Sequence, residues 1–227
     1  MRVFGAVLVG FCGSIAVGQA SSTAQLRFIP RMGEQPLLLD SATVLSDDVP
    51  VTITAFRFYF GQCMAHRKGE WVSVGQGYHL VDAADPSSCV FDLGDALASA
   101  DSISFLLGVD SLTNVSGAFG GDLDPIKGMY WAWNSGYINL KLEGNSPVSP
   151  YPSRTFELHL GGYLPPFAAV QRITLPVPER PLIVRVDVKP LLRAAGVHTR
   201  CNVMSPSERA VYLSKVAATM FKVDASH

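Results

Sequence analysis

Short stretches of alternating apolar and polar residues recur along most of the chain. In residues 137–143, Ile138, Leu140 and Leu142 fall on one side of an extended chain, and polar side chains fall on the other. Residues 155–160 alternate in the same way, and residues 52–60 are rich in β-branched and aromatic side chains. A period of two is the period of a β-strand. Further segments of this kind lie at 78–82, 102–109, 173–175 and 184–188.

Glycine, asparagine and proline pairs separate these segments and mark turns. Many short strands with turns between them are typical of two packed antiparallel sheets. The sequence therefore predicts a mainly β fold, a two-sheet β-sandwich.

Near its end the chain changes to a helical period. Residues 205–208, Ser-Pro-Ser-Glu, have the spacing of a capping box with proline at the first helical position. Apolar residues then recur at helical spacing, which predicts a C-terminal α-helix packed against the sandwich. A shorter helix is expected over residues 190–195. The apolar residues of the longer helix are Ala210, Leu213, Ala217, Met220 and Phe221.

The first residues indicate export. Arg2 precedes an apolar run over residues 3–17, which ends at Gly18-Gln19-Ala20. This pattern predicts a signal peptide over residues 1–20 with cleavage after Ala20. The run is too short for a membrane span. We therefore expect residues 21–227 to form a single exported domain without a membrane span.

The composition and charge of the chain limit the classes of molecule that it can bind. With 48% hydrophobic and 16% charged residues the chain can build a buried core. The net charge is −1 and no basic cluster is present, which argues against nucleic acid or an anionic membrane as a partner. In an oxidising compartment, two of Cys63, Cys89 and Cys201 are expected to pair. We predict a Cys63–Cys89 bridge, which leaves Cys201 free.

The motifs of common enzyme classes are missing. The sequence has no glycine-rich phosphate loop, no pair of histidines around a glutamate on a helix, no Cys-x-x-Cys and no Gly-x-Ser-x-Gly. No nucleophile and base stand at a recognisable spacing. The sequence therefore predicts a binding protein and not an enzyme.

Residues 128–137, Gly-Met-Tyr-Trp-Ala-Trp-Asn-Ser-Gly-Tyr, are unusually aromatic. On a strand, Trp131 and Trp133 would share one face, about 7 Å apart. They could anchor the core of the sandwich. Alternatively, with Tyr137 they could form an exposed stacking face of a carbohydrate- or surface-binding module.

This segment also carries a family resemblance. It follows Gly-Val-Asp-Ser at 108–111 and Gly-Asp-Leu-Asp-Pro at 121–125, and Lys-Leu-Glu-Gly follows at 141–144. Together with residues 78–82, 156–163 and 204–206, these stretches resemble the signature of the MbnP-like family. Proteins of this family are periplasmic partners of MauG-like di-haem enzymes. The resemblance covers nearly the whole mature chain.

The resemblance implies copper as the ligand. Family members are associated with copper handling, some beside genes for the copper chelator methanobactin, and the di-haem partner is thought to oxidise a tryptophan to kynurenine. An intact indole nitrogen is only a hydrogen-bond donor, whereas the amine freed by ring opening could join imidazoles around Cu(I). Trp131 and Trp133 are both candidates, and Tyr130 and Tyr137 could help to pass an electron hole toward a distant haem.

Two histidines are the expected copper ligands. His159 lies opposite the apolar side of its strand, within the family-like block 156–163. His79 lies on the short strand 78–82, where Asp82 could orient its ring. Both imidazoles would have to converge beside an indole. We expect the remaining candidate ligands to have structural roles. His66 should lie in a solvated loop, His198 and His227 on the surface, and Met64, Met129 and Met204 in the core. The polar residues Asp110, Asn114, Asp122 and Asp124 should form turns rather than bind calcium.

Overall fold

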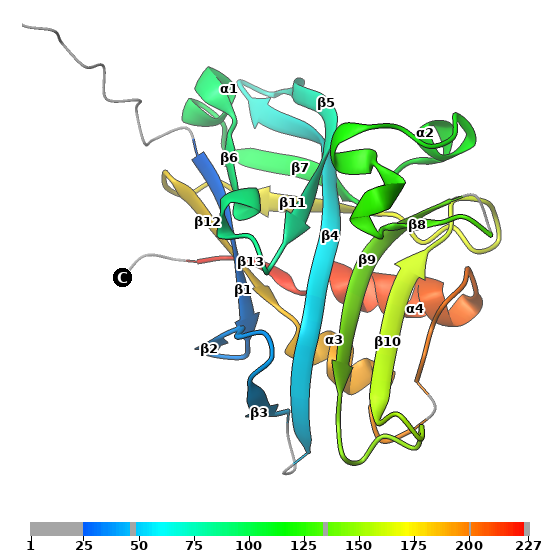
Figure 1. Ribbon diagram of the computed structural model, residues 1–227. Helices are drawn as coiled ribbons and strands as arrows, with labels where there is room; N and C mark the ends of the chain where they lie inside the picture. The colour runs from blue at the N-terminus through cyan, green and yellow to red at the C-terminus, as the bar shows by residue number, and fades with distance from the viewer. Residues whose placement is uncertain (1–24, 46–48, 134–135, 200, 225–227) are drawn as a thin grey trace, which may run out of the picture.

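Two sheets face each other in the computed structural model, which describes residues 25–45, 49–133, 136–199 and 201–224 (Figure 1). The predicted signal peptide lies outside the described residues. The chain is mostly β, with few helices, as the alternating pattern predicted.

The first sheet brings the beginning and the end of the described chain together. Its central pair, β1 and β12, is parallel, with Leu26 opposite Leu182 and Arg31 opposite Asp187. The strands are β1 (Gln25–Met32), β2 (Gln35–Pro36), β6 (Val90–Asp92), β12 (Leu182–Asp187) and β13 (Phe221–Val223). Strands β2 and β6 both pair with β1, and β13 pairs with β12.

The second sheet is antiparallel and is centred on the long strand β4. Strands β9 and β7 pair with one edge of β4 in succession, and β3 and β5 pair with it as well. The bounds are β3 (Ala42–Val44), β4 (Pro50–Arg67), β5 (Glu70–Asp82), β7 (Ser102–Leu107), β8 (Tyr130–Trp131), β9 (Gly136–Asn145), β10 (Thr155–Gly161) and β11 (Gln171–Pro176). We call the face toward the first sheet the inner face and the opposite one the outer face.

Within the part of the chain that the structure describes, four α-helices and three short 3₁₀ turns connect the strands. The C-terminal helix α4 packs near β10 and β11, and the expected short helix is α3. No helix among the described residues combines the length and the apolar character needed to cross a membrane. The bounds are α1 (Gly94–Ala98), α2 (Ser111–Val115), α3 (Lys189–Ala195), α4 (Glu208–Ala218), η2 (Pro86–Cys89), η3 (Gly121–Leu123) and η4 (Pro125–Lys127).

Helix α4 starts later than the capping-box spacing predicted. The hydroxyl of Ser207, and not that of Ser205, accepts a hydrogen bond from the backbone N–H of Ala210 at 3.1 Å. Pro206 therefore precedes the helix. Both serines offer the same side chain, and the backbone places Ser207 in the extended conformation that a capping residue needs.

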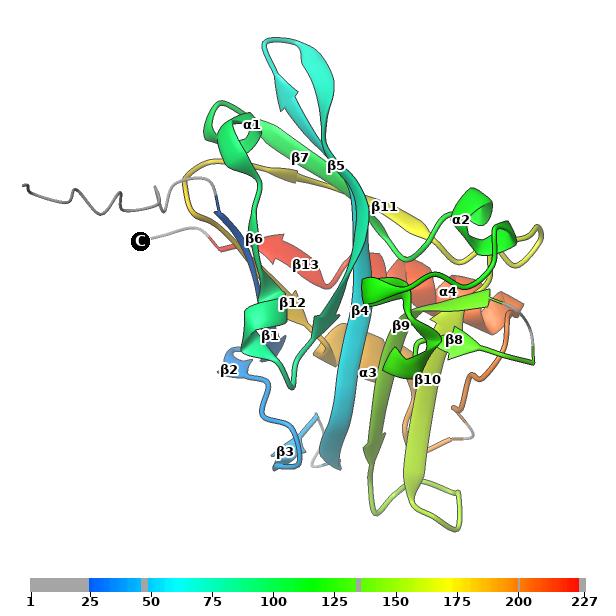
Figure 2. The ribbon, with the colours of Figure 1, turned by 45° about the horizontal axis from the view of Figure 1, so that its top comes forward.

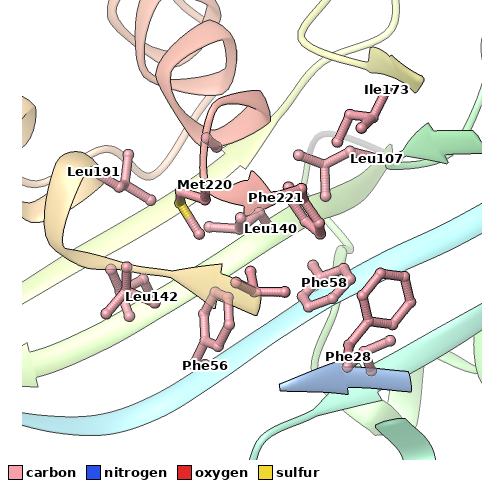
Figure 3. Packing of buried hydrophobic residues seen from close by; sticks show 14 of the residues in the cluster. Phe28, Phe56, Phe58, Leu107, Leu140, Leu142, Ile173, Leu191, Met220 and Phe221 are labelled. Atoms are coloured by element: carbon pink, nitrogen blue, oxygen red, sulfur yellow. The ribbon is translucent and has the colours of Figure 1, made fainter. Parts of the chain in front are cut away.

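Aromatic rings fill the space between the sheets. Phe28 on β1 is buried and makes edge-to-face contacts with Phe58 and Phe221 at centroid distances of 5.4 and 6.0 Å (Figure 3). Contacts of this geometry add to the free energy gained by burying the rings. Leu140 and Leu142 of β9 extend the same layer. The inner face of the second sheet is thus the apolar face that the period-two pattern predicted for Leu140 and Leu142. Ile138, predicted to share that face, belongs instead to a separate apolar cluster with Tyr137, because the pairing of β9 with β10 shifts between Leu140 and Ile138.

Strand β4 changes faces in its middle. Phe56, Phe58 and Phe60 point inward, but the pairing shifts between Gly61 and Met64, and Gln62 has a φ of 45°. Beyond this β-bulge, Cys63 and Ala65 belong to the core. Met64 and His66 consequently point outward, because a bulge inserts one extra residue into the alternation.

The three cysteines that the structure describes are buried free thiols. The predicted Cys63–Cys89 bridge is therefore wrong. Cys63 lies on β4 opposite Gly75, whereas Cys89 ends η2 with its sulfur 4.0 Å from the carbonyl oxygens of Asp82 and Asp85. Cysteine spacing carries no information about which elements become neighbours.

Candidate metal residues and the tryptophan cluster

A second apolar cluster lies on the outer face of the second sheet, beneath the loop that contains η3, η4 and β8. Tyr59 of β4 and Tyr137 of β9 are buried there, with their rings 5.8 Å apart. The Tyr59 hydroxyl donates a hydrogen bond to the carbonyl oxygen of Asp122 at 3.1 Å, and the Tyr137 hydroxyl accepts one from the N–H of Phe119 at 3.0 Å. Burial raises the pKa of both phenols, so they stay protonated.

Polar side chains shape this loop, as predicted. Asp110 caps α2 by accepting from the N–H of Thr113 at 2.7 Å, and Asp124 caps η4 by accepting from Ile126 at 3.0 Å. The amide of Asn114 donates to two carbonyls, and its oxygen accepts from the N–H of Tyr137 at 2.8 Å. These contacts hold the loop against β9 and confirm the turn-forming reading of Asp110, Asn114 and Asp124.

The two neighbouring tryptophans have different surroundings. Trp131 is 4% exposed and Trp133 is 67% exposed, with their ring centroids 5.7 Å apart. Trp131 rests on β10, where a Cβ at Gly161 would lie 2.8 Å from its ring. Its indole N–H is buried without a partner in the described part of the chain. Since Trp131 and Tyr137 are buried, the three rings do not form an exposed stacking face.

His159 lies on the outer face of β10 and is 6% exposed. Its Nε2 is 2.6 Å from Oε1 of Glu143, which is also 3.4 Å from Nζ of Lys141. The His159 hydrogen bond, opposed by burial, lowers the pKa of Glu143 to about 2. His159 precedes Gly161 by two positions, so the structure does place it near Trp131. Its Nε2, however, is already hydrogen-bonded to Glu143.

His79 lies on β5 opposite Phe60, and so on the inner face. Its ring stacks on Phe60 at 6.1 Å, and its Nδ1 is 3.6 Å from Oδ2 of Asp122. Asp82, the expected orienting group, instead accepts from Nε of Arg57 at 2.7 Å. That expectation is wrong because Asp82 follows His79 by three positions, an odd number that puts the two side chains on opposite faces.

The structure does not bring His79 and His159 together. One row of paired residues crosses the sheet from Asp82 on β5 through Arg57 and Lys141 to His159 on β10. This row spans three strand spacings, about 14 Å, and His79 lies on the other face. The predicted convergence is therefore wrong. Among the described residues, no group of three or more His, Cys, Asp and Glu side chains could hold a metal ion.

The structure contains a contact between an imidazole and an indole that the sequence did not predict, between His66 and Trp71. His66, expected in a solvated loop, lies on β4 directly opposite Trp71 of β5, and the ring centroids are 5.1 Å apart. Nδ1 of His66 is 2.7 and 3.0 Å from the two carboxylate oxygens of Asp101. This contact lowers the pKa of Asp101.

A hairpin signal could have located this pair. Lys68 and Gly69 have φ values of 51° and 84°, and Arg67 pairs with Glu70 around them. A two-residue turn with positive φ angles is the usual connection of a tight β-hairpin. If Lys68 and Gly69 are taken as such a turn, His66 falls directly opposite Trp71.

Taken together, the fold and this outer-face cluster define a two-sheet β-sandwich that carries an aromatic loop region over one sheet. The family model described as MbnP matches residues 21–205, and the chain belongs to the MbnP family. Among solved structures, MbnP from Methylosinus trichosporium has a similar fold, with a TM-score of 0.55 and 15% sequence identity over 83% of this chain and 86% of that one. A search of curated proteins gives no match.

Proposed function

We propose that this protein is a periplasmic, non-enzymatic copper-binding protein, in which a MauG-like di-haem enzyme oxidises a tryptophan to complete the metal site. Membership of the MbnP family supports this proposal. The observation that carries it is the contact between His66 and Trp71, with ring centroids 5.1 Å apart. It joins an imidazole to an indole that ring opening would convert into an amine ligand.

The residues around this pair fit Cu(I). Asp101 bonds Nδ1 of His66 and so leaves Nε2 as the metal-binding nitrogen. Met64 lies two positions before His66 on the same face, where its thioether is a soft donor. A small number of nitrogen and sulfur ligands suits Cu(I). The ion would be held by these soft ligands and would not act as an acid catalyst. Trp71 is 43% exposed, so an oxidant can reach it.

The predicted ligands remain as a second arrangement on the outer face. Trp133 is exposed and could be oxidised, whereas Trp131 is enclosed by apolar groups. A cation radical on Trp131 would be poorly solvated, and its N–H has no acceptor among the described residues to take the proton. His159 would have to leave Glu143 before it could bind a metal. The geometry therefore favours His66 and Trp71.

The test compares the mature protein produced with and without its di-haem partner. Peptide mass mapping reports kynurenine at each tryptophan, and copper stoichiometry is measured on the same samples. We expect conversion at Trp71 only after exposure to the partner, and one more bound copper ion in that sample than in the sample produced without the partner. His66→Gln should remove this additional copper, and the matched variant His159→Gln should preserve it.

Two results would contradict the proposal in different ways. Unmodified tryptophans, with no copper gained after exposure to the partner, would remove this copper site. Additional copper that is lost in His159→Gln but kept in His66→Gln would move the site to the Trp131 and Trp133 cluster.

A further inference from the structure

A cavity of about 250 Å³ lies under the β4–β5 hairpin, on the inner face of the second sheet. Figure 2 shows this hairpin projecting from the rest of the molecule. The cavity lies between the hairpin and residues 90–93, and both Cys63 and His79 line it. It belongs neither to the His66–Trp71 pair nor to the outer-face cluster, because those groups lie on the other side of the sheet.

Glycines leave the cavity accessible. Gly75 pairs with Cys63, and no atom lies within 4 Å of the position that a Cβ of Gly75 would occupy. Gly77 also lines the cavity and is exposed like Gly75. The two glycines therefore open this side of the cavity, in whose wall Cys63 lies 3% exposed.

The two nitrogens of His79 have different neighbours. Nδ1 is 3.6 Å from the Asp122 carboxylate. Nε2 is 4.0 Å from the position that a Cβ of Gly77 would occupy. Nε2 is therefore turned toward the glycine-lined wall. Rings of Phe60 and Phe91 pack on the imidazole at 6.1 and 5.1 Å and limit its rotation. At 3.6 Å the Asp122 carboxylate accepts no hydrogen bond from Nδ1, but its charge lies on the side of the ring opposite to Nε2.

We propose that Cys63 and His79 form a second metal site in this cavity, specific for Cu(I) and independent of any tryptophan oxidation. A thiolate and an imidazole are ligands that select Cu(I) among biological metals. Zn²⁺ normally requires four ligands, and the described residues offer no such group here. Binding replaces the thiol proton by the metal: Cys63–SH and Cu(I) give the copper thiolate and one proton released to solvent, without a change of oxidation state.

Release of the thiol proton makes binding at this site dependent on pH. Since one proton leaves for each ion bound, the affinity should rise about tenfold per pH unit while the thiol of the free protein is protonated. His66 and Trp71 contain no thiol, so the site proposed there lacks this proton release.

The experiment is an anaerobic titration of the mature protein, produced without the di-haem partner, with Cu(I) in competition with a chromophoric chelator. We expect one Cu(I) per protein with an ultraviolet sulfur-to-copper absorption. Cys63→Ser and His79→Gln should each weaken binding by at least about tenfold. Cys201→Ser is the matched control, because it removes another buried thiol and should leave the affinity unchanged.

Equal affinity of Cys63→Ser and the unmodified protein, or binding without the sulfur-to-copper absorption, would overturn the proposal. If Cys63→Ser fails to fold, His79→Gln decides alone, because half of that side chain is exposed and its replacement leaves the core intact. His66→Gln distinguishes the two sites, since it should leave this titration unchanged whether or not the oxidised tryptophan binds copper.

Discussion

The Glu143–His159 ion pair should make the stability of the fold depend on pH below 5. The pKa of Glu143 is lowered from 4.5 to about 2, first by the hydrogen bond from His159 and against the effect of burial. At 1.36 kcal/mol per pKa unit, this lowering corresponds to about 3 kcal/mol of stabilisation. Because 29% of the Glu143 side chain is exposed, screening by water reduces the expected value to about 1–2 kcal/mol.

The sign follows from the direction of the change. A carboxylate whose pKa is depressed by folding contributes its full stabilisation above its unfolded pKa, here 4.5. The contribution disappears as the pH falls from 4.5 toward 2. Replacing Glu143 by Gln removes the ionised form at every pH. Wild type should therefore be more stable than Glu143→Gln by about 1–2 kcal/mol at pH 6, and the difference should vanish near pH 2.

Urea unfolding monitored by tryptophan fluorescence measures this difference at pH 6, 4, 3 and 2.5. Glu70→Gln is the matched control, since Glu70 is exposed beside the turn of the β4–β5 hairpin and lies on neither β9 nor β10. Its stability should follow that of wild type through the whole range. A gap between wild type and Glu143→Gln that stays constant from pH 6 to pH 2.5 would refute the assignment of the pH dependence to this pair.

Three further outcomes follow from packing. Gly161→Ala should lower the free energy of unfolding by about 1–3 kcal/mol in chemical denaturation, because its Cβ would lie 2.7 Å from a carbonyl oxygen. Gly120→Ala is the control and should leave the free energy of unfolding unchanged, because no atom lies within 4 Å of its Cβ position. Phe28→Ala should cost about 3–5 kcal/mol in chemical denaturation, since the ring is 1% exposed, and a cost below 1 would contradict the core assignment. N-bromosuccinimide should modify Trp133 before Trp131, as peptide mapping would show; simultaneous loss would refute their different exposure.

Much of the sandwich could be predicted because its strands bury one face. Residues 137–143 and 155–160 alternate cleanly, and they became β9 and β10. The parallel pairing of β1 with β12 could not be predicted in this way. Those strands are more than 150 residues apart, and their contact depends on how the whole chain folds back. Local periodicity reports which face of a strand is buried but not which strand lies beside it.

The candidate site was predicted less well for a related reason. His159 and His79 each look like isolated polar residues on an apolar strand, and nothing local states which face of the assembled sheet each will occupy. The order of the strands sets the distance between the two histidines, since β4 and β9 separate β5 from β10. Trp131 and Trp133 are adjacent in the alternation, yet one is enclosed by the loop before β8 and the other is not.

The bulge in β4 is the physical reason that one strand can serve both proposed copper sites. Gln62 takes a left-handed φ of 45°, and its amide donates to the hydroxyl of Tyr78, whose ring crosses over Gly61. Without the extra residue, the alternation of Phe56, Phe58 and Phe60 would continue and direct His66 into the core. With it, Cys63 points into the inner cavity and His66 outward to Trp71. Deleting the extra residue of this strand should therefore disrupt both proposed sites.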